Sequence, residues 1–251
     1  MNIVILGSGN AAAVLGRKFK AAGHQIKQVY SRQAGAASAL AYEWDTESTN
    51  YLSLITQEAD VYIIAVSDNA IAELATQINL PGKVVAHTAA SVSASVLKPI
   101  TEHYGVFYPL QSLRRENPQL PEIPIYFDGA TDRARNALQA LASSIASGVP
   151  AIAGDEARQK LHVAAVFVNN FVNHLYVLAQ TYCEKEGIDF RQLLPLIDET
   201  AERIHNISPK SAQTGPALRH DEGTVQSHLQ LLEKHPELKK VYIMMTESIQ
   251  G

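Results

Sequence analysis

The first residues whose types suggest chemistry form a glycine-containing turn near the start of the chain. Residues 7–12 read Gly-Ser-Gly-Asn-Ala-Ala, and they lie between an apolar run typical of a strand and an alanine-rich stretch that favours a helix. Gly7 permits a tight turn, Gly9 lets the backbone approach a pyrophosphate, and Ala12 keeps the helix close to the sheet. The alternative is an ordinary glycine turn between a strand and a helix. We expect the phosphates of a dinucleotide, attracted by the positive end of the helix, to be bound by Gly7, Ser8, Gly9, Asn10 and Ala11.

The second informative stretch, Val29-Tyr30-Ser31-Arg32, ends the next predicted strand. A protein that binds NAD usually carries Asp or Glu here, which holds the ribose 2′-OH. This chain carries a hydroxyl and a guanidinium instead, and the guanidinium offers a fixed fork of donors that suits a phosphate. Ser31 and Arg32 therefore predict NADP rather than NAD as the cofactor. The alternative for Arg32 is a solvated surface side chain.

Two further pairs of residues fall at the ends of predicted strands, beside the expected cofactor. They are Val66-Ser67 and His87-Thr88, and we expect all four residues to contact the cofactor. Ser67 has a second possible role as the N-cap of a helix over residues 69–78, and the two roles are compatible.

A long apolar segment, residues 161–178, carries the most informative polar side chains of the second half. It contains no charged residue, but its histidines and asparagines are costly in hydrocarbon, so we expect a buried helix of a soluble protein. On a 3.6-residue repeat His162, Asn169 and Asn173 share one stripe with Val166, and Asn170 lies close to it. Histidine ordinarily titrates near neutrality and suits a proton donor. We therefore expect catalytic roles for His162 and Asn170, the alternative being a polar network that joins domains or subunits.

Alternating strand and helix signals surround these residues in the first half of the chain. Strand-like runs occur at 2–6, 25–31, 61–67, 83–87, 105–108 and 123–128, and several of them are continuous Val/Ile runs, as expected for parallel strands covered on both faces. Helix signals lie between them at 10–22, 33–42, 69–78, 93–100 and 131–146. This order predicts an open, doubly wound α/β sheet. After a short apolar piece at 148–152 the pattern is helical, with Asp155 as the expected first N-cap, so we predict an NADP-binding domain over 1–153 and an all-α domain over 154–251.

The composition excludes several other classes of protein. The chain has 251 residues, a formal net charge of −4 and no run of Lys or Arg, which argues against a protein that binds nucleic acid through a basic surface. Its single cysteine cannot form an internal disulfide, and its nine histidines show no metal-ligand spacing, so we expect no metal. No signal peptide is apparent, and we expect a cytoplasmic protein.

Several short motifs give the chain a resemblance to a known superfamily. It resembles the two-domain NADP oxidoreductases that include pyrroline-5-carboxylate reductase, the 6-phosphogluconate and hydroxyisobutyrate dehydrogenases, and deazaflavin-dependent NADP reductase. It is more closely similar to a Rossmann-like oxidoreductase subfamily with a helical C-terminal domain of unknown function. Besides the Gly-Ser-Gly-Asn and Tyr-Ser-Arg stretches, the segments that carry this resemblance are 66–71, 87–91, 108–112, His162 with Asn170, and 214–225.

The resemblance implies a reaction and a set of substrate-binding residues. It implies hydride transfer between NADP(H) and a small anionic carbonyl or imine compound, and a homodimer formed through residues beyond 155. Ser91 would lie where the related dehydrogenases bind the polar group of the substrate, although Ser91 or Ser93 is alternatively an N-cap. Gln111 and Arg219 would close the sides, and the alternative for Arg219 is a surface arginine. The related dehydrogenases carry Lys and, four residues later, Asn on the long helix.

This chain departs from that last pattern, which leaves other functions open. Lys160 is followed four residues later by Ala164, so His162 is the better candidate for the proton donor. The missing asparagine keeps open a non-catalytic NADP-binding redox sensor as the alternative function, and a structural protein with a vestigial site as a third. Asp221 is expected to be the N-cap of a helix over 222–234.

Overall fold

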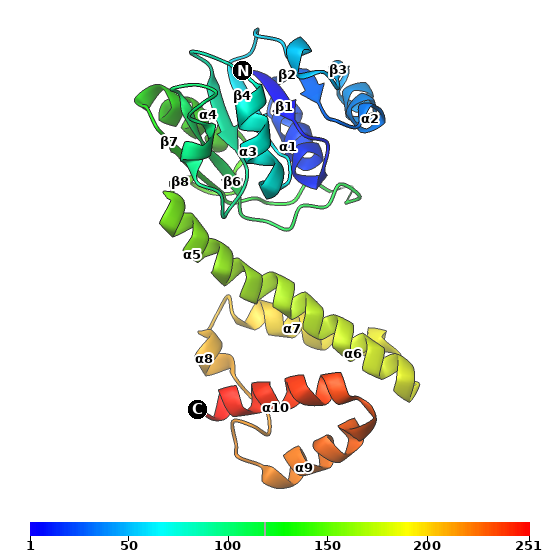
Figure 1. Ribbon diagram of the computed structural model, residues 1–251. Coiled ribbons are helices and arrows are strands. Elements are labelled where there is room, and N and C mark those ends of the chain that lie inside the picture. Colours follow the sequence, from blue (N-terminus) through cyan, green and yellow to red (C-terminus); the bar gives the residue numbers. More distant parts are fainter. Residues whose placement is uncertain (118) are drawn as a thin grey trace. The chain divides into compact units, whose positions relative to one another are not determined.

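The structure is a computed structural model that describes residues 1–117 and 119–251. The chain forms two compact units, Met1–Phe167 and Val168–Gly251. The first contains the sheet and its helices, and the second is helical (Figure 1).

Within the described residues, eight strands form one sheet in the order β3-β2-β1-β4-β5-β6-β7-β8. Neighbouring strands are parallel except for β6 and β7, which are antiparallel. The mostly parallel, doubly wound sheet that the sequence predicts is therefore confirmed, while β3 and the antiparallel pair were not predicted. The strands are β1 (Asn2–Leu6), β2 (Gln25–Tyr30), β3 (Glu47–Thr49), β4 (Val61–Ile64), β5 (Val84–His87), β6 (Tyr104–Pro109), β7 (Ile125–Gly129) and β8 (Ala151–Ile152).

Helices cover both faces of the sheet, which explains why its central strands are continuous apolar runs. Ile3 and Ile5 of β1 pack in one core with α1 (Asn10–Ala21), α2 (Ala34–Trp44) and α4 (Asp132–Ile145). Val4 and Leu6 point to the opposite face and pack with α3 (Asp68–Gln77). Since successive strand side chains alternate between faces, a strand buried on both sides must be apolar throughout.

The helix expected over 93–100 is a short 3₁₀ helix, Ala94–Leu97. Ser93 caps it by accepting a hydrogen bond from the backbone N–H of Ser95 at 3.3 Å. Pro99 has no backbone N–H to donate to a helix, and serine side chains compete for backbone groups, so a longer helix does not form.

The helical region begins with a long, continuous helix made of three parts. α5 (Asp155–Ala165) passes into a π-helix (Val166–Phe171), which passes into α6 (Val172–Glu186). The N-cap of α5 is Gly154 and not Asp155. The carboxylate of Asp155 accepts hydrogen bonds from the Ala94 N–H and from Arg158, so it does not cap its own helix.

Shorter helices make up the rest of the second unit. The positive φ of Gly187 ends α6, and Asp221 caps α9 through the Thr224 N–H at 3.1 Å, as the sequence predicts. The remaining elements are 3₁₀ helices at Leu52–Leu54, Phe190–Leu193 and Leu232–Lys234, with α7 (Leu194–Arg203), α8 (Pro209–Ala212), α9 (Glu222–Leu231) and α10 (Pro236–Gln250).

The prediction that residues 161–178 form a buried helix is wrong for the single chain. None of the most apolar 18-residue window of the helix Asp155–Glu186 is buried. In the part of the chain that the structure describes, this helix alone is long and apolar enough to cross a membrane, a criterion that core helices of soluble proteins also meet. The π-helical turn also alters the stripe predicted from a 3.6-residue repeat, because its i→i+5 hydrogen bonds widen the turn.

Candidate active site

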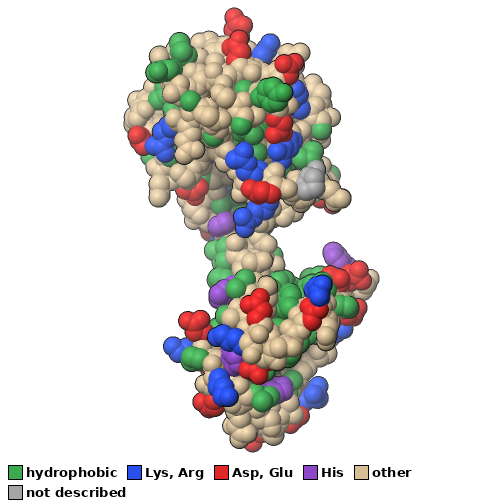
Figure 2. All heavy atoms as spheres, turned by 90° about the vertical axis from the view of Figure 1, so that its right-hand side faces the viewer, with side chains coloured by type: hydrophobic (Ala, Val, Ile, Leu, Met, Phe, Trp, Pro, Cys, Tyr) green, Lys and Arg blue, Asp and Glu red, His purple; other side chains and the backbone are tan. Residues whose placement is uncertain are grey.

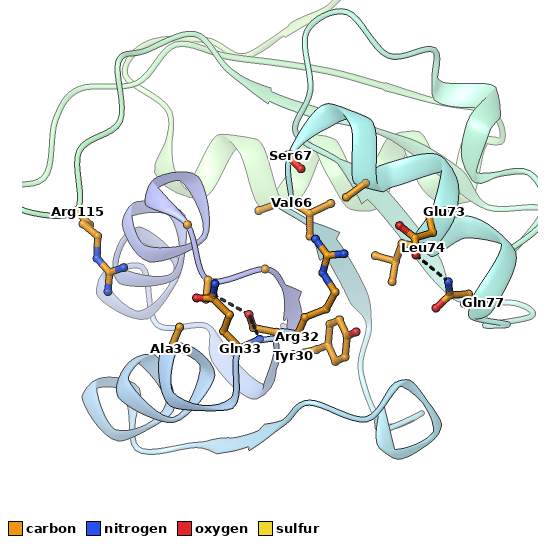
Figure 3. A pocket seen from close by; sticks show the side chains of 16 residues that line it. Tyr30, Arg32, Gln33, Ala36, Val66, Ser67, Glu73, Leu74, Gln77 and Arg115 are labelled. Atoms are coloured by element: carbon orange, nitrogen blue, oxygen red, sulfur yellow. Dashed lines mark hydrogen bonds between the residues drawn. The ribbon is translucent and has the colours of Figure 1, made fainter.

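A cavity of about 430 Å³ lies at the carboxyl ends of β1, β2 and β4 (Figure 3). The strand order reverses between β1 and β4, which is where doubly wound sheets bind ligands. The cavity brings together seven of the expected cofactor residues, namely Gly7, Ser8, Gly9, Ser31, Arg32, Val66 and Ser67.

The glycine turn has the backbone geometry that a phosphate-binding loop needs. Gly7 has a φ of +133°, and a Cβ there would lie 2.2 Å from the carbonyl oxygen of Ala65. A Cβ on Gly9 would meet no atom within 4 Å, so the space beside it is open. Gly9 is the N-cap of α1 and provides no side chain to cap it, which leaves first-turn N–H groups available to an anion.

The loops after β1 and β2 are joined by a hydrogen bond between the hydroxyls of Ser8 and Ser31 at 2.8 Å. Arg32 is exposed, and its side chain extends across the cavity toward Val66 (Figure 3). Ser67 precedes α3, but its side chain makes no capping hydrogen bond, so its hydroxyl remains available to the cavity.

Arg115 also lines the cavity, and the sequence analysis missed it. It lies in the loop after β6, on the other side of the glycine turn from Arg32 (Figure 3). Its N–H donates to Oδ1 of Asn10 at 3.4 Å, and its carbonyl accepts from Nη1 of Arg17 at 2.7 Å. Asn10 therefore holds this loop rather than lining the cavity. No local pattern in the sequence pointed to Arg115, because the loop meets α1 only through tertiary contacts.

His87 ends β5 and is completely buried, so its side chain does not line the cavity. Its Nδ1 accepts the Ala89 N–H at 3.2 Å, which leaves Nε2 to donate to the Ser93 carbonyl at 3.3 Å. The pKa of His87 is lowered to about 4, chiefly by burial and also by the charge of Arg158, while the Ser93 carbonyl and Asp155 act in the opposite direction. His87 thus fixes the loop that follows β5.

That loop contains the other residues expected next to the substrate. Thr88 is half-buried, and Ser91 is exposed and does not cap the 3₁₀ helix, which has Ser93 as its cap. Ala11, at the start of α1, is half-buried and packs against the core rather than lining the cavity.

Arg158 of α5 holds the same loop and was not predicted. Its side chain is fully buried, Nε donates to the Ala90 carbonyl at 2.9 Å, and Nη2 donates to the Val92 carbonyl at 2.5 Å. Nη2 also donates to Asp155 at 2.8 Å. Its Nη1 is buried without an acceptor among the described residues. The spacing of three residues between Asp155 and Arg158 was the available signal.

Tyr108 of β6 and His162 of α5 form a hydrogen-bonded pair near Arg158. The Tyr108 hydroxyl lies 3.1 Å from His162 Nδ1, and the rings meet edge to face. Tyr108 is 6% exposed and His162 is half-buried. Burial raises the pKa of Tyr108, and the positive charge of Arg158 opposes that change.

The other candidates have the following surroundings. The side-chain amide of Gln111 is used within its own loop: Nε2 donates to the Glu122 carbonyl at 2.9 Å, and Oε1 accepts from the Ser112 N–H at 2.9 Å. Lys160 is paired with Glu156 at 2.5 Å. Asn170, on the π-helix, and Arg219, before α9, are exposed residues of the second unit, and their roles stay predictions.

Two family models match the chain, one in each half. Residues 2–91 match NADP oxidoreductase, coenzyme F420-dependent, and residues 123–249 match the domain of unknown function DUF2520. A crystal structure of a protein provisionally named an NADP oxidoreductase, from Bacteroides fragilis, is 37% identical, with a TM-score of 0.90, over 99% of this chain and 97% of that one. The chain belongs to the NADP oxidoreductases that carry a DUF2520 domain. Its fold is Rossmann-like and its cofactor is NADP, as the sequence predicts.

More distant structures share the fold of this NADP oxidoreductase. An imine reductase from Pseudomonas sp. is 17% identical, with a TM-score of 0.70, over 99% of this chain and 93% of its own. A reductive aminase from Aspergillus terreus, in complex with NADPH and ethyl-5-oxohexanoate, is 16% identical, with a TM-score of 0.69, over 100% and 95%. Among curated proteins, no sequence matches the chain.

Proposed function

We propose that this protein is an enzyme that transfers a hydride between NADP(H) and a small anionic carbonyl or imine compound. The observation that carries the proposal is the hydrogen-bonded pair Tyr108–His162, because it lies on β6 and α5 at the same carboxyl edge of the sheet as the dinucleotide cavity. The names of the distant structures, an imine reductase and a reductive aminase, support this class of substrate.

The residues that line the cavity fit the parts of NADP. Ser31 and Arg32 suit the 2′-phosphate, and the turn that starts at Gly7 suits the pyrophosphate. Arg115 adds a second cation on the pyrophosphate side of the turn. We expect Val66, Ser67 and Thr88 to contact the nicotinamide. His87 would contribute its backbone only, because both nitrogens of its ring are already hydrogen-bonded.

The cofactor supplies the hydride, and the protein supplies orientation and a proton. His162 is the proposed proton donor, since it is half-buried and its ring is held by a neighbouring hydroxyl. Ser91 is the proposed contact of the substrate's polar group on the loop that His87 and Arg158 fix. Asn170, Gln111 and Arg219 remain proposals from the sequence.

The test is a screen of NADPH oxidation with small keto acids, aldehydes and imines. With a substrate that the screen identifies, His162→Ala is expected to lower turnover by about 10²–10⁴, while NADP affinity stays nearly unchanged. His174→Ala, on the exposed part of the same long helix, is the matched control and should keep wild-type turnover. NADP binding without oxidation of NADPH by any compound in the screen would favour the redox-sensor function instead.

We also propose a homodimer formed through residues beyond 155. Only four residues of the unit Val168–Gly251 are buried, and Val168 and Leu196 are 75% and 63% exposed. Hydrophobic side chains gather on the surface of this helical region (Figure 2). A segment with so little buried surface gains little stability alone, so a partner is expected.

The proposed partner is a second copy and not a lipid bilayer. His162, Asn170 and Asn173 lie within the apolar stretch of the helix Asp155–Glu186 and are costly in hydrocarbon. We propose a cytoplasmic location, which agrees with a single, buried cysteine in the free thiol form.

A further inference from the structure

The ring of His162 has one nitrogen engaged and one nitrogen left for chemistry. Nδ1 faces the Tyr108 hydroxyl at 3.1 Å, and no hydrogen bond within the described residues engages Nε2. We propose that Tyr108 is the positioning residue of the proton donor: it holds Nδ1, so that Nε2 of His162 is the atom that delivers the proton. This inference rests on the reductase function proposed above.

The burial of the two side chains assigns their roles. Tyr108 is 6% exposed, whereas His162 is half-buried and has one side open. The Tyr108 hydroxyl lies 3.1 Å from Nδ1, so it can fix the orientation of the more exposed ring. A carboxylate or hydroxyl that holds one imidazole nitrogen sets which nitrogen reacts, and this is a recurring use of such pairs.

Tyr108 is well suited to this role because a rigid element carries it. It lies on β6, where it pairs with Tyr126 of β7 in the antiparallel ladder. Sites built on strands hold their side chains more accurately than sites on loops. The groups that face it are Arg158, whose guanidinium is fixed by the Ala90 and Val92 carbonyls, and Tyr126.

The proton transfer can be written so that it balances. In the charged ring, Nδ1–H donates to the Tyr108 oxygen and Nε2–H faces the substrate. The Nε2–H bond breaks and an O–H or N–H bond forms on the substrate, whose carbon has received the hydride and its electron pair from NADPH. His162 becomes neutral with its remaining proton on Nδ1, and it regains a proton at Nε2 from water.

The hydrogen bond to Tyr108 stabilises the charged ring of His162 more than the neutral ring. A charged imidazolium must donate from Nδ1, and Tyr108 is the acceptor that it finds there. Removing that partner costs the neutral ring less stabilisation than the charged ring, because hydrogen bonds to charged groups are stronger. Removing the hydroxyl therefore disfavours the charged ring, which is the form that delivers the proton.

The test is Tyr108→Phe, which keeps the ring and removes only the hydroxyl. We expect kcat to fall about 10- to 100-fold, because the ring of His162 is no longer held, while KM and NADP affinity change less than about twofold. The alkaline limb of the kcat–pH profile should move to lower pH, because the charged ring loses its acceptor. Tyr126→Phe makes the same change at the paired position of β7 and should leave kcat and the profile unchanged.

An NMR titration of the His162 ring provides a readout that needs no turnover. Its midpoint should move to lower pH in Tyr108→Phe and stay in place in Tyr126→Phe. An unchanged midpoint and an unchanged kcat–pH profile in Tyr108→Phe would overturn the positioning role. If the wild-type protein oxidises no NADPH, the proposed function fails, and the NMR titration alone then decides whether Tyr108 holds the ring.

Discussion

The buried imidazole of His87 makes the stability of the first unit depend on pH in a way that one substitution removes. Its pKa is lowered from 6.5 to about 4, chiefly by burial. As the pH falls below about 6.5, the unfolded chain binds a proton at this ring and the folded chain does not. Stability that is present above this pH is therefore lost progressively as the pH falls toward 4.

The size of the effect follows from the two pKa values. The difference of 2.5 units between 6.5 and 4 corresponds to about 3.4 kcal/mol, which is lost in full only below pH 4, where the ring is charged in both the unfolded and the folded chain. Between pH 8 and pH 5 the loss is about 2 kcal/mol of the free energy of unfolding. His87→Gln should remove this component, because an amide does not titrate, although the variant is less stable at every pH.

The assay is denaturant unfolding at several pH values, followed by fluorescence of the single tryptophan. Trp44 is buried on α2 in the first unit, so its signal reports that unit. The same substitution at His205, an exposed residue of the second unit, is the control for the loss of one imidazole. If His87→Gln loses as much stability between pH 8 and pH 5 as the wild type does, His87 is not held neutral in the folded state.

Four further predictions concern binding and assembly. Arg32→Ala should weaken NADP binding about 10- to 150-fold and hardly change NAD binding, measured by calorimetry, and an equal loss for both cofactors would exclude a 2′-phosphate contact. Arg115→Ala should instead weaken both cofactors, because it lies on the pyrophosphate side of the glycine turn; a loss confined to NADP would contradict this. NADP at 100 times its Kd should add about 2.7 kcal/mol and raise the Tm by roughly 5–11 °C, whereas no shift at millimolar NADP speaks against the cavity. Sedimentation at micromolar concentration should report a dimer, and a monomer would contradict the proposed interface.

The features that the sequence predicts well are local ones. The strand before Gly7, the turn and α1 follow one another along the chain, and residue types there report their own backbone geometry. The same is true of the N-cap at Asp221, which bonds a residue three positions away. In each case the interacting groups are neighbours in sequence, so a short window contains the whole signal.

The features that the sequence analysis missed depend on distant partners. The antiparallel pairing of β6 with β7 is a choice of neighbour that no strand pattern encodes. Arg115 reaches the cavity because Asn10 and Arg17 hold its loop, more than 95 positions away. The π-helix shifts the phase of the long helix, and a pattern that assumes a 3.6-residue repeat cannot detect it.

The loop that carries Arg115 is tied down by contacts within the folded chain. Arg17 donates to its carbonyl, and Glu43 of α2 fixes the same guanidinium at 2.6 and 3.0 Å. The backbone at Arg115 is therefore already ordered when the protein has folded, so a dinucleotide that binds beside it has less conformational entropy to remove. Association should then be a single phase whose rate rises linearly with ligand concentration. The time that a dinucleotide stays bound is set by its own contacts rather than by the opening of a lid.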